Sequence, residues 1–120
     1  MTGTDISFGD NYNTVGDAIT HDSPSTDFKI TEDGLYRVTY YVYFFSQTGT
    51  ASFQIHNYGS SLDSVNVTDS RTPMEAIKST VLPLPAGAVL TLEFLGMLNG
   101  DVDAVEVYYS SIKIEKIGNL

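Results

Sequence analysis

The chain has 120 residues and a formal net charge of −9, and 42% of its residues are hydrophobic while 18% are charged. This length gives one domain with a substantial core, and this composition is typical of a folded chain rather than a disordered one. Six Lys and Arg against 15 Asp and Glu, together with the absence of Cys, exclude nucleic-acid binding through phosphate contacts, disulfide bonds and thiol chemistry.

The N-terminal segment MTGTDISFGD has neither the basic region nor the apolar region of a signal peptide. Further along the chain, no apolar run approaches the roughly 18–20 residues of a membrane-spanning helix. We expect residues 1–4 to be a disordered start or the remnant of a stalk, and residues 5–118 to form a single domain.

Three short strands are expected before the longest one. Residues 5–8 are apolar at alternate positions, residues 13–20 have a weaker pattern that Gly16 interrupts, and residues 27–30 alternate cleanly. The TEDG segment that follows predicts a turn in which Gly34 adopts a positive φ.

The segment GLYRVTYYVYFF, residues 34–45, predicts one long strand with two largely apolar faces. Its even positions are Tyr36, Val38, Tyr40, Val42 and Phe44, and its odd positions are Arg37, Thr39, Tyr41, Tyr43 and Phe45. A two-sheet sandwich of this size has one inner space, which holds only one of these faces. We therefore expect the even face in the subunit's own core and Tyr41, Tyr43 and Phe45 against another subunit. The alternative is that these rings lie half-exposed over the sheet.

Two further strand patterns and one ambiguous segment follow. Residues 51–58 alternate cleanly, which predicts an exposed position for His56, and residues 62–68 form another β-like run. Residues 74–84 combine helical spacing and helix-forming residues with β-branched residues and Pro83. We expect this last segment to be irregular at first and then a strand.

The C-terminal part predicts two strands around a loop at residues 99–103. Residues 88–97 form a strong strand pattern, and residues 104–117 form a second one in which the hydrophobic residues change from odd to even positions midway. This change predicts a bulge at Ser110 and Ser111, or a strand that is buried on both faces. About eight to ten strands without a convincing helix predict an all-β fold, an antiparallel two-sheet sandwich or barrel.

Two other strands repeat the excess of apolar residues seen in the long strand. Residues on the second faces of 88–97 and 104–117 are apolar as well, which suggests that one sheet is the association surface. The predicted subunit interface consists of Tyr41, Tyr43, Phe45, Leu95, Met97 and Tyr109.

Catalytic chemistry has little support in the sequence. The motifs of nucleotide sites, zinc sites and serine nucleophiles are missing, and neither His21 nor His56 lies in a recognisable nucleophile motif. We expect no enzymatic activity, and a small hydrolase is the alternative from that class.

Two weaker candidate sites involve loops. Asp101 and Asp103 offer carboxylate oxygens of the kind that calcium binds, although solvated turn residues are the alternative. Calcium is the one cofactor that we consider. Tyr12 and Tyr58 lie in or beside loops, where an aromatic ring can act as a platform for a sugar.

Several segments resemble known proteins. TEDGLYRVTYYV, LPLPAGAVLTLEF and SSIKIEKIG resemble strands in the globular heads of complement's first-component recognition subunit and of the tumour necrosis factor (TNF) superfamily. YNTVGDAI (12–19), FKITEDGLYRVT (28–39) and IKIEKIG (112–118) are similar to segments in the C-terminal heads of bacterial collagen-like spore-surface (exosporium) glycoproteins. The resemblance covers most of residues 5–118.

The resemblance implies a TNF-like jelly roll that assembles as a homotrimer, with the sheet of the long aromatic strand lining the three-fold axis. It also implies a non-enzymatic, trimerising head of a filamentous surface protein at an extracellular, spore, cell or virion surface. In family members such a head has a structural or adhesion role, with glycan or protein ligands on its outer loops. A carbohydrate-binding β-sandwich module and a phage fibre tip are the alternatives that stay open.

Overall fold

The computed structural model of the chain describes residues 4–9, 11–22, 25–47, 50–58, 60–68, 74–95 and 105–120. Within these ranges the secondary structure consists of β-strands and turns, which confirms the all-β prediction. None of the described residues belongs to a helix long and apolar enough to cross a membrane.

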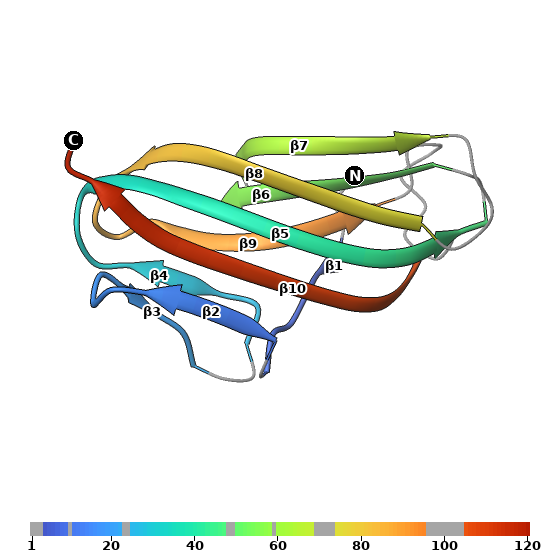
Figure 1. Ribbon diagram of the computed structural model, residues 1–120, viewed down its shortest axis with the longest axis horizontal. Coiled ribbons are helices and arrows are strands. Elements are labelled where there is room, and N and C mark those ends of the chain that lie inside the picture. The colour runs from blue at the N-terminus through green and yellow to red at the C-terminus, as the bar shows by residue number, and fades with distance from the viewer. Residues whose placement is uncertain are drawn as a thin grey trace.

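Two sheets lie face to face, as Figure 1 shows. The sheet that we call the β9 sheet has the order β3 (Ile19–Thr20), β4 (Phe28–Ile30), β9 (Val89–Leu95), β6 (Thr50–Asn57) and β7 (Ser60–Thr68), with β1 (Thr4–Asp5) paired to β9. The other, the β5 sheet, has the order β2 (Tyr12–Val15), β10 (Val105–Gly118), β5 (Gly34–Ser46) and β8 (Met74–Leu84). All pairings are antiparallel except that of β2 with β10.

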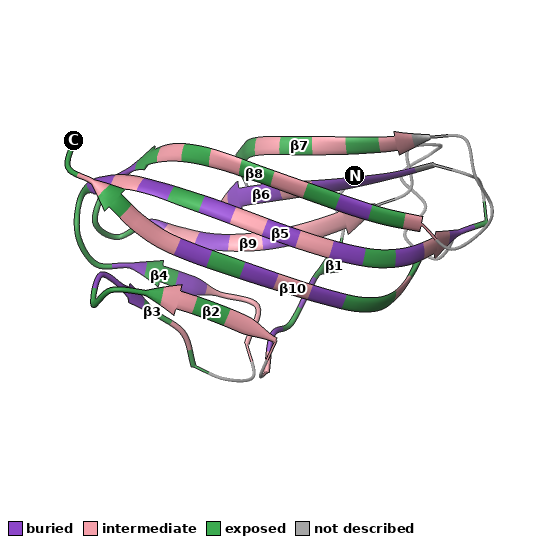
Figure 2. Cartoon of the chain, in the orientation of Figure 1, coloured by how far each residue is buried: buried purple, intermediate pink, exposed green. Residues whose placement is uncertain are grey.

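The core fills the space between the sheets. The even positions of β5 are completely buried and comprise Tyr36, Val38, Tyr40, Val42 and Phe44. Figure 2 shows the resulting alternation of buried and more exposed residues along β5 and β10. The ring of Phe44 packs edge-on against Phe53 of the β9 sheet, with ring centroids 4.8 Å apart. The prediction that the even face belongs to the subunit's own core is therefore confirmed.

The two buried tyrosines of β5 satisfy their hydroxyl groups with backbone carbonyls. The Tyr36 hydroxyl donates to the Glu32 carbonyl oxygen at 2.6 Å, and the Tyr40 hydroxyl donates to the Phe53 carbonyl oxygen at 3.4 Å. Burial raises the pKa of Tyr40, because a phenolate there would lose its hydration. Both rings thus contribute apolar area to the core without leaving a buried donor unpaired.

Residues 74–84 form a strand over their whole length, which corrects the prediction of an irregular start. The strand β8 pairs with β5 from Met74, opposite Phe44, to Leu84, opposite Gly34. Eleven consecutive residue pairs hold it there. The helix propensity of its first residues amounts to at most about 0.7 kcal/mol per residue, so long-range pairing prevails.

The bulge in β10 lies two residues before its predicted position. Val107 lies opposite Phe44 and Tyr109 lies opposite Tyr43, so Tyr108 is the extra residue. An extra residue reverses the faces of all residues after it. As a consequence Val107 points toward the core, whereas Tyr109 joins Tyr43 on the outer face.

The prediction of a positive φ at Gly34 is wrong, but the glycine has another reason to be there. The glycines with positive φ among the described residues are Gly16 and Gly87. A Cβ atom at Gly34 would lie 2.6 Å from Cε of Lys116 and 2.8 Å from the carbonyl oxygen of Gly118. Close approach of β10, rather than a left-handed turn, therefore requires a residue without a side chain at this position.

Candidate functional site

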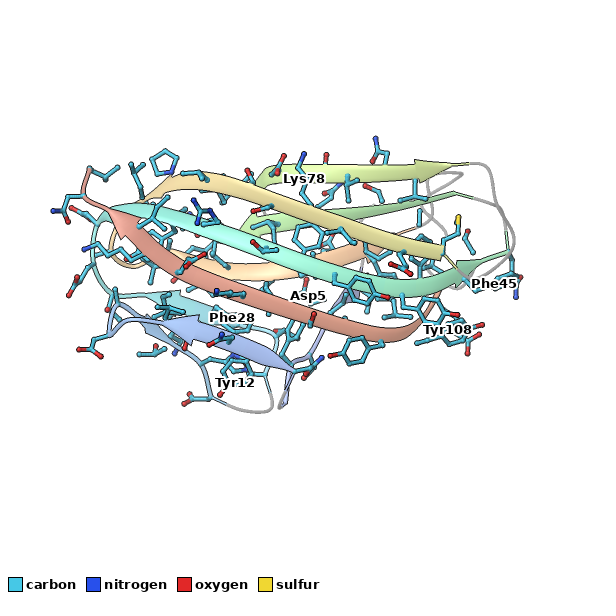
Figure 3. The ribbon with its side chains drawn as sticks, in the orientation of Figure 1. Asp5, Tyr12, Phe28, Phe45, Lys78 and Tyr108 are labelled. Atoms are coloured by element: carbon cyan, nitrogen blue, oxygen red, sulfur yellow. The ribbon has the colours of Figure 1, made fainter. Side chains whose placement is uncertain are left out.

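The outer face of the β5 sheet carries a group of aromatic rings, which we call the aromatic face. It consists of Tyr41, Tyr43, Phe45, Tyr108 and Tyr109. The rings of Tyr41 and Tyr109 have centroids 6.1 Å apart, and those of Tyr43 and Tyr108 have centroids 5.6 Å apart. Figure 3 shows the labelled Phe45 and Tyr108 at the same end of the sheet. The four tyrosine rings pack in pairs across β5 and β10, and those of Tyr43, Tyr108 and Tyr109 remain open to solvent in the single chain.

Solvent exposure of these rings is high for aromatic side chains. Tyr109 is 53% exposed, Tyr108 is 49% exposed and Tyr43 is 37% exposed. The apolar surface continues along the sheet through Ile77 and Val81, which are 63% and 47% exposed. Ile77 lies opposite Tyr41 in the register of β8 and β5, so it directly adjoins the aromatic face. An apolar surface of this kind is typical of a protein–protein contact.

Polar groups accompany the apolar ones on this surface. The hydroxyl groups of Thr39 and Ser79 lie 3.0 Å apart, and Arg37 donates to Glu115 Oε1 at 3.4 Å. A shallow hollow of about 330 Å³ extends beside Tyr41, Ile77 and Lys113. The face therefore combines apolar side chains with hydrogen-bonding groups that lie toward the Gly34 end of β5, and subunit interfaces contain both kinds of group.

Partial burial and the nearby Glu75 carboxylate raise the pKa of Tyr41. The Tyr41 hydroxyl hydrogen-bonds with that carboxylate, and its position favours the neutral phenol. A neutral phenol suits a surface that is to be desolvated, because a phenolate would resist the loss of water.

The outer face of the β9 sheet has a different character. Gln54 and His56 of β6 and Thr91 and Glu93 of β9 share this face. Its neighbour β7 presents the exposed residues Ser64 and Asn66. The two outer faces of the sandwich are thus unequal: the β5 sheet presents aromatic and aliphatic side chains, and the β9 sheet presents polar and charged ones.

A family model described as the BclA C-terminal domain matches residues 1–118 of the chain. The chain belongs to the BclA C-terminal domain family. This membership confirms the resemblance to a collagen-like surface-protein head that the sequence suggested. A comparison with curated proteins gave no match.

Solved structures establish that this BclA C-terminal domain has a TNF-like jelly-roll fold. Eiger TNF from S. frugiperda is 18% identical with a TM-score of 0.66, over 78% of this chain and 66% of that chain. Rabbit GITRL is 16% identical with a TM-score of 0.54, over 86% and 79% of the two chains. Pika GITRL is 17% identical with a TM-score of 0.53, over 86% and 85%. The domain thus spans slightly less than two thirds of the Eiger TNF chain.

The structure brings together part of the predicted interface. Tyr41, Tyr43, Phe45 and Tyr109 share the aromatic face, but Leu95 belongs to β9, in the opposite sheet. The prediction that all three strands form one association surface is therefore wrong. Alternation along a strand indicates which residues share a face, but it does not indicate which sheet the strand joins. Met97 lies outside the described residues.

Sequence reasoning missed Tyr108, Ile77 and Val81. Tyr108 was missed because uninterrupted alternation places it on the same face as Ile112 and Ile114, opposite to Tyr109. Ile77 and Val81 were taken as helical spacing, although the same residues also lie on one face of a strand.

The other predicted sites are the two sugar platforms and the calcium site. Tyr12 is half-buried, and its ring packs on His21 and Phe28 at centroid distances of 4.4 and 5.8 Å, so it supports the core instead of forming an exposed platform. Tyr58 is 76% exposed and remains a platform candidate. Asp101 and Asp103 lie outside the described residues.

The last predictions concern metal binding, catalysis and the two histidines. The described part of the chain contains no group of three or more His, Asp and Glu side chains arranged to hold a metal ion. Calcium and the absence of enzymatic activity stay predictions. Both nitrogens of His21 lie 2.8 Å from backbone carbonyl oxygens, those of Asp27 and Phe8, which ties this ring into the fold. The predicted exposure of His56 is wrong, since this residue is only 7% exposed.

Proposed function

We propose that this domain is the trimerising globular head of a filamentous, collagen-like surface protein, with a structural and adhesion role and no catalytic activity. The observation that carries the proposal is the exposed aromatic face on the outer side of the β5 sheet. Family membership supports the same role.

Energetics favours burial of the aromatic face. Covering a large apolar side chain stabilises a protein by roughly 1.5–3 kcal/mol relative to leaving it in water. Tyr43, Tyr108 and Tyr109, together with Ile77 and Val81, would forgo much of this free energy in an isolated chain. An exposed β-sheet face rich in aromatic residues also favours aggregation, and a specific interface with other copies removes that hazard.

The three-fold arrangement follows from the resemblance to complement-type and TNF-like heads. In such heads the sheet that carries the long aromatic strand surrounds a three-fold axis, and this sheet corresponds to the β5 sheet. The polar outer face of the β9 sheet then faces solvent, in agreement with the unequal character of the two faces. A head of this kind holds three chains of a stalk in register and belongs at an extracellular, spore, cell or virion surface.

The mass of the assembly in solution tests the proposal. Light scattering coupled to gel filtration should give about three times the chain mass of 13.1 kDa at micromolar concentration. A mass of one chain under these conditions would contradict the proposed trimer, and specific glycan binding by such a monomer would favour a carbohydrate-binding module instead.

A further inference from the structure

A hollow of about 370 Å³ lies on the outer face of the β9 sheet, on the side of the sandwich opposite to the aromatic face. The side chains that matter here are those of Asp5, Asp27, Lys29, His56, Tyr58 and Glu93. They come from β1, β4, β6 and β9 and from the residues that adjoin β4 and β6. Segments that are distant in the sequence thus place titratable groups around one small space.

Negative charge dominates this hollow. Three carboxylates line it together with one ammonium group, that of Lys29. Asp5 lies directly opposite Glu93 in the pairing of β1 and β9. Burial, and after it the charge of Glu93, raise the pKa of Asp5, which indicates that the two carboxylates influence each other. A cationic group between them would relieve this repulsion.

His56 adds a hydrogen-bond acceptor that the described residues leave unpaired. Its Nε2 lies 2.7 Å from Gln54 Oε1, and the amide nitrogen of the same Gln54 donates to Ser52 Oγ at 3.2 Å. Since Oε1 only accepts, Nε2 carries the hydrogen and Nδ1 of the neutral ring presents a lone pair. Nδ1 is buried and has no hydrogen-bond partner among the described residues.

The carboxylate of Glu93 lies beside this lone pair but has no hydrogen to donate to it. Glu93 Oε2 lies 3.6 Å from His56 Nδ1, which is beyond hydrogen-bonding distance. In the neutral ring Nδ1 only accepts, so a donor placed beside it would satisfy it. A buried acceptor without a donor is unfavourable, and the site therefore selects for a ligand rich in N–H groups.

Tyr58 supplies an aromatic wall for the hollow. It is 76% exposed and has a φ of 50°, a backbone conformation that is uncommon for a bulky residue. This φ is accounted for by the tight hairpin connection between β6 and β7, where Asn57 pairs with Ser60. The face of an aromatic ring attracts a cation, so this side chain complements the carboxylates.

We propose that this hollow binds a primary ammonium group, held by the carboxylates of Asp5 and Glu93 and by Nδ1 of His56, beside the ring of Tyr58. An ammonium group has three N–H donors, one for each of these three acceptors. The group can come from an amino sugar or from an alkylamine, which share this chemistry. The site is independent of the proposed trimer, because its residues belong to the β9 sheet and its neighbours and a monomer would retain them.

Titration of the ¹⁵N-labelled chain, followed by amide chemical shifts, tests the proposal. Glucosamine should shift the resonances of Tyr58, Thr91 and Glu93 with a millimolar dissociation constant, and glucose, which lacks the amine, should bind at least about tenfold more weakly. Putrescine, an alkylamine, is titrated in parallel. Tighter binding of glucosamine would identify the ligand as an amino sugar, and tighter binding of putrescine would identify it as an alkylamine. An equal response to glucose and glucosamine, or no shift with either amine, would overturn the proposal.

Single substitutions distinguish binding at this site from a general effect of the protein's negative charge. Glu93→Gln keeps the shape of the side chain and should weaken glucosamine binding about tenfold, and Tyr58→Asn should weaken it about threefold. Asp17→Asn removes the same charge from an exposed turn and should leave the affinity unchanged. Equal weakening by Asp17→Asn and Glu93→Gln would refute a specific site. Long-range ¹⁵N–¹H spectra should find the hydrogen of His56 on Nε2, and a ring protonated on both nitrogens would also refute it.

Discussion

Replacement of Tyr109 by Asp tests the aromatic face most directly. Tyr109 is already 53% exposed in the single chain, so the variant subunit loses little of its own packing. In an assembly the ring becomes covered. Complete burial of a large apolar side chain stabilises a protein by roughly 1.5–3 kcal/mol. Because about half of the Tyr109 side chain is still exposed in the single chain, its burial in the assembly contributes about 1 kcal/mol per subunit and about 3 kcal/mol per trimer.

The carboxylate of Tyr109→Asp adds a second and larger cost. Each charge removed from water without a partner costs several kcal/mol, and a three-fold assembly buries three of them. Since every 1.4 kcal/mol is a factor of ten, loss of the ring alone raises the dissociation constant about a hundredfold, and the charges raise it much further. We expect Tyr109→Asp to be a folded monomer at micromolar concentration.

Light scattering gives the mass of the variant, and far-ultraviolet circular dichroism reports its fold. Tyr58→Asp is the matched control, since it makes the same substitution at an exposed tyrosine beside the other sheet and should remain a trimer. If Tyr109→Asp kept the mass and melting temperature of the parent chain, the aromatic face would be an ordinary surface. If both variants dissociated, the effect would be one of added charge and would not locate the interface.

Two further predictions concern the fold itself. Gly34→Ala should destabilise the subunit by about 1–3 kcal/mol in urea denaturation, because the new Cβ would lie 2.8 Å from the backbone carbonyl oxygen of Gly118. Asn119→Ala at an exposed position should have no effect. Asp5→Asn should stabilise the fold at neutral pH. The pKa of Asp5 is raised from its ordinary 3.8, so the folded chain binds more protons there than the unfolded one, and its stability falls as pH rises above 3.8. Urea denaturation at acidic and neutral pH should show that Asp5→Asn weakens this pH dependence, and an unchanged pH profile would contradict the assignment.

Much of the fold was predictable because alternation is a strong signal in long strands. The even positions of β5 are buried as expected, and the resemblance in residues 12–19, 28–39 and 112–118 identified the family. Alternation alone could not assign β9 to a sheet, because which strands pair depends on contacts between distant residues. For the same reason the sequence of residues 74–84, with its helical spacing, did not predict that this segment pairs with β5 as a strand.

The candidate sites were predictable to the extent that they rest on one strand. Tyr41, Tyr43 and Phe45 were found because they alternate with a core face. The hollow on the β9 sheet was not found, since Asp5, His56 and Glu93 come from three strands and have no motif in common. His56 was expected to be exposed because its side chain points away from the core. Alternation does not reveal that neighbours on an outer face can cover a side chain as well.

The bulge at Tyr108 links the core to the proposed interface. If β10 alternated without interruption from Val107, its later inward positions would be odd, and Ile112 and Ile114 would lie on the outer face. They are instead 4% and 0% exposed, because the extra residue shifts the phase. The same shift turns Tyr109 outward, next to Tyr108. Deletion of Tyr108 should therefore keep Ile112 and Ile114 in the core, because Val107 and Tyr109 would still lie opposite Phe44 and Tyr43, now in a regular ladder. It should weaken only the interface, through the loss of one ring.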